Sequence, residues 1–346
     1  MSRALVISGG GSKGAFAVGV IKRLQREYPG LEFDIFVGTS TGSLIVPLVA
    51  LGEMALVEKL YTTQKTEDIV ITNRLGDRIN DNSIFDAGPL EELVIGNYTD
   101  QRYSTLLVSG KKIFLNTVCL QTGNLVVFTN ATDPAVGKYY EVKTLADADH
   151  FRRAVMASAS QPVFMPPVKV NKNVPGEAHP DHQFVDGGVR EYAGVEMAID
   201  NGATEIFTIL LSSDQADDDD GTITGLFTIL QKTVDIFIDD VGKNDLIIPE
   251  QYNEALEYID AIKNKMKRAG ISADKITEYF NVRGRQSPYE DKVPLKLYTI
   301  RPDAPLGGGP GGLTFDPVAM QAMLKKGETA GDDFIASLKP ADITWA

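Results

Sequence analysis

Short apolar runs and longer helical patterns alternate along the first 60 residues. The apolar runs are residues 4–7 and 34–37, and their composition predicts two strands. A glycine-rich turn follows each run and leads into apolar residues at helical spacing, as at Phe16, Val20, Ile21 and Leu24. Strand, glycine turn and helix, given twice in succession, predict a parallel sheet with crossover helices. We therefore expect an α/β fold with a central, mainly parallel sheet and helices on both faces.

The rest of the chain continues this mixture of strands and helices. Further strands are predicted at residues 112–120, 125–129 and 204–211, the first two forming a hairpin. Long helices are predicted at residues 223–238 and 250–268, and a last helix follows Asp316 and Pro317. Pro47 should bend or break the helix that begins near Ser43 after about two turns.

The length of 346 residues fits one large domain or two of average size. We predict one domain over residues 1–346. Its motif-bearing core covers about residues 4–212, and a helical C-terminal portion covers about residues 222–346.

The composition is that of an ordinary globular protein, with 43% hydrophobic and 23% charged residues. It excludes a collagenous or wholly disordered chain. The chain has 34 Lys and Arg residues and 47 Asp and Glu residues, which gives a net charge of −13. A negatively charged chain has no general electrostatic attraction to nucleic acid or to an anionic membrane surface. The N-terminus lacks the features of a signal peptide, and no apolar stretch reaches the roughly 18 residues of a membrane span. We expect a cytoplasmic protein.

Three features are interpreted as structural. Cys119, in a strand-like apolar run, is expected to fill the core. The run Asp217–Asp220 is expected to be a solvated loop. His179 and His182, with Asp181 or Asp186, offer metal ligands but lack the helical i, i+4 spacing, so we expect no metal and no cofactor.

The pattern G-x-S-x-G at Gly38–Gly42 has a strand before it and a helix after it. In that context a sharp turn holds the serine in a strained conformation and exposes its hydroxyl at the carboxyl edge of the sheet. The N-terminus of the following helix favours developing negative charge. Ser40 is therefore a candidate nucleophile; the alternative is an ordinary turn in which Ser40 only caps the helix.

The first glycine turn, Gly9–Gly14, fits the dinucleotide pattern G-x-G-x-x-G. The acidic residue expected at the end of the second strand is missing, because Asp34 lies at the start of that strand. Lys13 is followed by Gly14, which excludes a Walker A motif. A glycine turn can instead present backbone N–H groups to an oxyanion, and two such turns at adjacent strand ends would lie side by side. We prefer the oxyanion hole to a nucleotide site.

An activated serine needs a base, and the sequence has only three histidines. One of them could serve in the order serine, acid, histidine. The other candidate is Asp186, which ends an apolar strand and precedes Gly187 and Gly188, so that it could approach a neighbouring turn closely.

These pieces together resemble the patatin-like phospholipase family. The match is the ordered set of Gly9–Gly14, Gly38–Gly42 and Asp186–Gly188, with the Ala-, Ser-, Pro- and Phe-rich segment 154–167 ahead of the aspartate. The resemblance covers most of residues 4–212. It implies the patatin-like three-layer architecture and hydrolysis of acyl ester bonds of lipids through an acyl-enzyme, as in a phospholipase A or lysophospholipase, without a metal.

By this resemblance Ser40 is the nucleophile and Asp186 its partner in a Ser–Asp dyad, and the amides of Gly10 and Gly11 form the oxyanion hole. The supporting positions of the motifs are Gly9, Ser12, Lys13, Gly14, Gly38, Gly42, Gly187 and Gly188. The implied partner is a phospholipid or another acyl-ester lipid, with room for peripheral membrane contact. The alternatives are a nucleotide-dependent oxidoreductase and a non-catalytic lipid-binding module of the same fold.

The chain departs from the family pattern after the aspartate. Where the family often has an Asn-Pro pair, this chain has Glu191, Tyr192, Ala193 and Gly194, which puts the packing near the dyad in question. The apolar face of the helix predicted at 223–238 could act as a lid or dock on a membrane, but such a face is more often core.

Overall fold

The computed structural model describes residues 2–72, 82–215, 221–281 and 292–339, together with 343 and 345. The predicted run Asp217–Asp220 lies outside these residues. The repeat expected at the N-terminus is present as β1 (Arg3–Ile7), α1 (Gly14–Glu27), β2 (Ile35–Thr39) and α2 (Thr41–Ala50).

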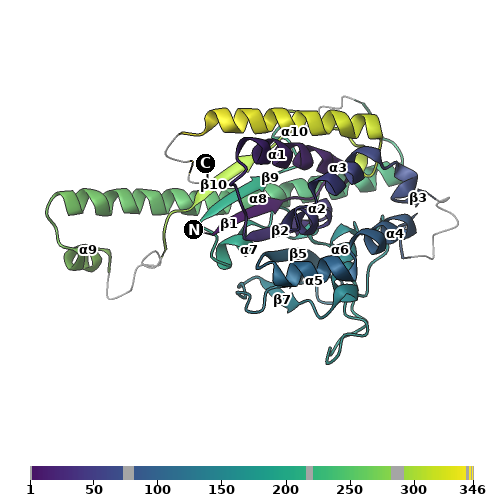
Figure 1. The fold of residues 1–346 in the computed structure, drawn as a ribbon, viewed down its shortest axis with the longest axis horizontal. Helices are drawn as coiled ribbons and strands as arrows, with labels where there is room; N and C mark the ends of the chain where they lie inside the picture. Colours follow the sequence, from purple (N-terminus) through teal and green to yellow (C-terminus); the bar gives the residue numbers. More distant parts are fainter. Residues whose placement is uncertain are drawn as a thin grey trace.

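A mostly parallel sheet runs through the middle of the molecule (Figure 1). Its strands follow the order β10 (Lys296–Ile300), β9 (Glu205–Ile209), β1, β2, β5 (Lys112–Cys119), β6 (Leu125–Thr129) and β7 (Tyr140–Thr144). Neighbours from β10 to β5 are parallel. The predicted hairpin is confirmed, since β6 pairs antiparallel with β5. The last residues of β5, 117–119, also pair antiparallel with β8 (Phe184–Asp186).

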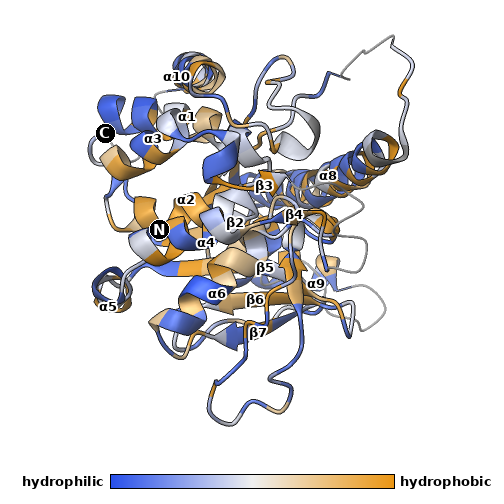
Figure 2. Cartoon of the chain, turned by 90° about the vertical axis from the view of Figure 1, so that its right-hand side faces the viewer, coloured by the Kyte–Doolittle hydropathy of each residue, from blue (hydrophilic) through white to orange (hydrophobic). Residues whose placement is uncertain are grey.

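Helices cover both faces of this sheet (Figure 2). The remaining helices are α3 (Met54–Thr63), α4 (Gly88–Asn97), α5 (Asp100–Val108), α6 (Ala148–Ala159), α7 (Val195–Asp200), α8 (Leu226–Arg268), α9 (Ala273–Phe280) and α10 (Pro317–Ser337). Alternate residues of β1 enter two separate cores: Leu5 and Ile7 pack with α1, α2, α6 and α10, and Ala4 and Val6 pack with α7. The expected α/β architecture of three layers is therefore confirmed.

Short elements connect these layers. They are the 3₁₀ turns η1 (Gly11–Lys13), η2 (Thr66–Asp68), η4 (Gly187–Val189) and η5 (Pro310–Gly312), and the two-stranded sheet of β3 (Ile71–Thr72) and β4 (Phe85–Asp86). Cys119 is buried in the core at the end of β5, as expected. None of the described helices is both long enough and apolar enough to cross a membrane.

The helices α1 and α10 lie side by side although they come from opposite ends of the chain (Figure 1). Two glycines allow the contact: a Cβ at Gly19 would lie 2.0 Å from the Leu324 carbonyl oxygen, and a Cβ at Gly327 would lie 2.0 Å from that of Phe16. Any side chain at either glycine would push the helices apart.

The prediction of two helices at 223–238 and 250–268 is wrong, because α8 is a single helix of 43 residues that contains Pro249. Contacts with the body of the protein hold it on both sides of the proline. Before it, Leu246 is buried in the core; after it, the Asn253 amide donates to the Leu295 carbonyl and accepts from the Leu295 N–H, at 3.0 and 2.7 Å. These contacts offset the backbone hydrogen bond that a proline removes.

The expected effect of Pro47 is only partly seen. The helix α2 continues through Pro47 and ends at Ala50, rather than breaking at the proline. Pro47 is buried, and the helix continues for only three residues beyond it, so the proline costs the bond to the Ser43 carbonyl without ending the helix at once.

Candidate active site

Ser40 occupies the sharp turn between β2 and α2. Its backbone has φ 56° and ψ −122°, a region that residues with a side chain rarely adopt. Ser40 precedes α2 but its side chain makes no capping hydrogen bond, so its hydroxyl is not used as a helix cap. The turn is tight because a Cβ at Gly38 would lie 2.6 Å from the Gly42 backbone, and one at Gly42 would lie 2.1 Å from the Ile7 carbonyl. Strain of this kind is characteristic of functional turns.

Asp186 ends β8, next to this turn. The residue is 4% exposed, and its carboxyl group accepts a hydrogen bond from the Gly188 N–H at 2.8 Å and interacts with the Ser40 hydroxyl. Burial raises the pKa of the carboxyl group from 3.8 to about 6, although the Ser40 hydroxyl and the Gly188 N–H both oppose the shift. Gly187 lets the strand approach β5, since a Cβ there would lie 2.6 Å from the Asn116 carbonyl oxygen.

The end of α6 holds both residues in place. The Ser40 N–H donates to the Ser158 hydroxyl at 3.1 Å, and that hydroxyl donates to the Asn116 carbonyl at 2.6 Å. Two residues further on, the Ser160 carbonyl accepts from the Asp186 N–H at 2.9 Å. A single segment therefore sets the distance between the serine and the aspartate.

The first glycine turn lies against the serine. A Cβ at Gly9 would be 3.0 Å from Ser40 Cβ, so only glycine fits there without displacing the serine. Gly10 and Gly11 both have positive φ, 154° and 57°. The Tyr192 hydroxyl donates to the Gly9 carbonyl at 2.8 Å and fixes the turn from the side of Asp186. The supporting glycine at the start of α1, Gly14, faces Tyr61 and Thr41 at distances that exclude a side chain.

A second glycine-rich loop covers this turn. A Cβ at Gly312 would lie 2.1 Å from the Gly10 carbonyl oxygen, and the Gly311 N–H donates to the Asp235 carboxylate of α8 at 3.2 Å. Burial raises the pKa of Asp235, and Lys13 is among the groups that oppose the shift. Ser12 is fully buried, and a Cβ at Gly308 would lie 2.6 Å from its hydroxyl oxygen.

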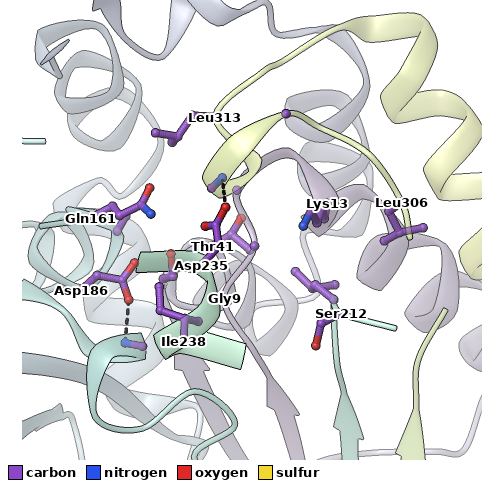
Figure 3. Close-up of a pocket in the computed structure, with 18 of the residues that line it drawn as sticks. Gly9, Lys13, Thr41, Gln161, Asp186, Ser212, Asp235, Ile238, Leu306 and Leu313 are labelled. Carbon is purple, nitrogen blue, oxygen red and sulfur yellow. Dashed lines mark hydrogen bonds between the residues drawn. The ribbon is translucent and has the colours of Figure 1, made fainter. Parts of the chain in front are cut away.

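A cavity of about 860 Å³ opens at Ser40 and Asp186 (Figure 3). One part of its wall is apolar and comes from α2, α3, α4 and the segment after the glycine loop, including Leu44, Leu60, Val94 and Phe315. The rest of the lining is mixed and includes Lys13 and, from α8, both charged residues such as Asp235 and apolar residues such as Ile238. Such a volume accommodates a flexible ligand with one apolar and one polar end.

The histidines do not take part in this arrangement. The rings of His179 and His182 stack at 4.5 Å, Asp181 pairs with Lys169, and the imidazole of His150 is buried against Asn171. No group of three or more possible metal ligands is found in the part of the chain that the structure describes.

A match to a family of known sequences decides which family the chain belongs to. The sequence model described as "Patatin-like phospholipase" matches residues 5–199, more than half of the chain, and the match contains both glycine turns, Ser40 and Asp186. The chain belongs to the patatin-like phospholipase family. Membership supports lipid acyl hydrolase activity.

Two individual proteins are also similar. Over 64 residues the chain is 41% identical to a cUMP-AMP-activated phospholipase of Escherichia coli; the matched stretch is 17% of this chain and 20% of that protein. The crystal structure of VipD from Legionella pneumophila aligns with 97% of this chain and 67% of that protein, at 13% identity and a TM-score of 0.46.

The departure from the family pattern after Asp186 has a structural explanation. The Glu191 carboxylate accepts from the Gly194 N–H at 2.9 Å and so closes the turn before α7. Tyr192 reaches Gly9, and Gly242 of α8 leaves the space for its ring, because a Cβ there would lie 2.5 Å from it. The Asp245 carboxylate accepts from the N–H groups of Tyr192 and Ala193. The loop is thus held by side chains and by α8.

The sequence does not assign a role to three residues that lie beside Ser40 and Asp186: Ser158, Gln161 and Tyr192. The first two belong to the segment 154–167, whose composition alone is distinctive. Ser158 and Ser160 are fully buried, and a pair of small hydroxyl residues at the end of an apolar helix is the signal that could have directed attention there.

Proposed function

We propose that this protein is a serine-dependent lipid acyl hydrolase in which Ser40 is the nucleophile and Asp186 the general base. The proposal is carried by the position of Ser40, which lies in a strained turn and whose hydroxyl interacts with the buried Asp186 carboxyl group at the edge of the cavity. The lining of the adjoining cavity supports a lipid ester as substrate, because it combines many apolar side chains with charged groups such as Lys13 and Asp235.

The reaction follows from these positions. Ser40 Oγ attacks the acyl carbonyl carbon while its proton passes to Asp186. The N–H groups of Gly10 and Gly11 stabilise the oxyanion of the tetrahedral intermediate. Collapse breaks the ester bond, the alcohol leaves with the proton from Asp186, and an acyl-Ser40 ester remains. A water molecule then gives a proton to Asp186 and attacks the carbonyl carbon of this ester. When the second tetrahedral intermediate collapses, the bond to Ser40 Oγ breaks, Asp186 returns the proton to Ser40 Oγ, and the fatty acid leaves.

A fluorophosphonate probe tests the nucleophile directly. We expect a single covalent adduct on the peptide that contains Ser40, located by peptide mass spectrometry. Because the E. coli relative is named as cUMP-AMP-activated, labelling is carried out with and without that dinucleotide. Absence of a Ser40 adduct under both conditions, in protein shown by circular dichroism to be folded, would contradict the proposal.

The pKa of Asp186 predicts how activity depends on pH. Only the ionised carboxylate accepts the serine proton, and the pKa of this group is about 6. We expect kcat/KM to level off above about pH 7 and to fall about tenfold per unit below pH 6. The measurement is a pH–rate profile with a neutral short-chain ester, after checking that enzyme held at each pH recovers full activity at pH 8. A profile that stays flat down to pH 4.5 would exclude Asp186 as the base.

A further inference from the structure

Gln161 places an amide in the wall of the cavity next to the dyad (Figure 3). It follows α6, and its backbone is fixed on both sides. The Gln161 carbonyl accepts from the Met165 N–H at 2.9 Å, and the preceding carbonyl, of Ser160, accepts from the Asp186 N–H at 2.9 Å. The side chain is therefore carried by the same segment that positions the catalytic aspartate.

The amide oxygen of Gln161 is buried and has no hydrogen-bond partner among the residues that the structure describes. The whole side chain is 7% exposed. On one side it is covered by the glycine-rich loop, since a Cβ at Gly311 would lie 2.7 Å from the amide oxygen and 3.0 Å from the nitrogen. Gly311 is itself held by its bond to Asp235. A buried acceptor without a donor is costly, and buried polar groups in native proteins are normally paired.

We propose that Gln161 is a specificity-determining residue whose amide oxygen accepts a hydrogen bond from a free hydroxyl group next to the scissile ester. This inference rests on the function proposed above and narrows the substrate to monoacyl lipids that carry a hydroxyl beside the ester, such as a lysophospholipid or a monoacylglycerol. Both share that hydroxyl, and only the lysophospholipid adds a phosphate.

Of the groups that a lipid can carry beside the scissile ester, a free hydroxyl suits the Gln161 amide oxygen best. In a diacyl lipid the same carbon carries a second ester, which has acceptor oxygens but no donor, so the Gln161 oxygen would stay unpaired. The loop at Gly311 also covers one side of Gln161, so any group that reaches the amide from the cavity must be small. Sites that bind a substrate hydroxyl discriminate strongly against analogues that lack it, because the protein group is then left without a partner.

The test compares matched esters on wild-type enzyme. Lysophosphatidylcholine is compared with its 2-deoxy and 2-O-methyl analogues, and a monoacylglycerol is compared with its own deoxy analogue. We expect kcat/KM to be at least about tenfold higher for each hydroxyl substrate. The 2-O-methyl analogue retains the oxygen atom but has no hydrogen to donate, so its kcat/KM should be as low as that of the deoxy analogue. If only the lysophospholipid pair shows the preference, the phosphate is required as well.

Two variants test whether Gln161 causes the preference for the hydroxyl substrates. Gln161→Met keeps the size of the side chain, removes the acceptor and should bring the hydroxyl-to-deoxy ratio close to one. Gln64→Met is the matched control, because Gln64 lines the same cavity but its amide already donates to the Thr63 hydroxyl at 3.3 Å, and it should keep the wild-type ratio. Fluorophosphonate labelling of Ser40 shows that each variant retains a reactive site.

The outcomes separate this inference from the proposed function. Wild-type enzyme that hydrolyses hydroxyl and deoxy esters equally well, or a Gln161→Met variant that keeps the wild-type ratio, would overturn the role of Gln161 and leave the hydrolase intact. Wild-type protein that neither reacts with the probe nor hydrolyses any of the esters would overturn the proposed function itself. The comparison on wild-type enzyme needs no variant and therefore does not depend on how Gln161→Met folds.

Discussion

Ser40→Ala should leave a folded protein whose kcat for ester hydrolysis is lower by about 10⁴-fold or more, because loss of a nucleophile removes the covalent route altogether. The measurement is release of fatty acid under saturating substrate. Ser104→Ala is the matched control, since the Ser104 hydroxyl is exposed and bonds only the backbone of its own helix, at 2.9 Å. A Ser40→Ala variant that keeps even a tenth of wild-type activity would contradict the assignment.

The same position allows a second, independent readout. Because Ser40 has φ 56° and ψ −122°, a conformation that favours glycine, Ser40→Gly should be as inactive as Ser40→Ala. Its free energy of unfolding should nevertheless be no lower than that of wild type, since relief of backbone strain offsets the added freedom of the unfolded chain. Urea unfolding of the two variants and wild type provides the comparison. A turn strained for catalysis predicts this combination, and an ordinary turn does not.

Asp186→Asn should lower kcat by about 10³- to 10⁴-fold, as expected when a buried carboxylate partner becomes an amide of the same shape. Asparagine retains an oxygen that can accept from the Gly188 N–H, so the fold should persist. What is lost is the ability to take the Ser40 proton. Activity within tenfold of wild type at pH 8 would show that another group acts as the base.

Asp186→Asn should raise the free energy of unfolding at pH 8, although it lowers the activity. The pKa of Asp186 is about 6 in the folded protein, above the 3.8 of the free group, so the folded state favours the protonated carboxyl group. This contribution is fully present below pH 3.8 and is lost as pH rises through 6, so the ionised carboxylate lowers stability at pH 8, by about 2–3 kcal/mol. Asp186→Asn removes that cost, and the variant should unfold at a higher urea concentration than wild type at pH 8 but not at pH 4.

The sequence was sufficient for features that depend on local chain geometry. The glycines at 38 and 42 and the strand before them predict a sharp turn at Ser40, and the structure has that turn. The alternation of strands and helices predicts the parallel sheet for the same reason, because each unit is encoded by about 30 consecutive residues.

Features that depend on distant residues could not be predicted in this way. Asp186 meets Ser40 because β8 pairs antiparallel with β5. The local pattern makes Asp186 one of several candidate bases, and the resemblance to a family selects it over the histidines. The unbroken α8 is a similar case: Pro249 argues for two helices, and the contacts of Leu246 and Asn253 with residues far along the chain decide for one. The Gln161 amide oxygen has no partner among the described residues, and no sequence pattern could indicate a partner that a substrate supplies.

The packing of the second glycine loop on the first determines when the cavity can be complete during synthesis. Ser40 and Asp186 are both made before residue 200, yet Gly312 covers the turn at Gly10 and α10 packs on the helix that follows it. Contacts over such long sequence separations are slow to form. A nascent chain therefore carries its serine and its aspartate for some time without a finished cavity. We expect the cavity to be complete only after Pro305 and Phe315, which line it, have been made and the loop between them has packed on the first glycine turn.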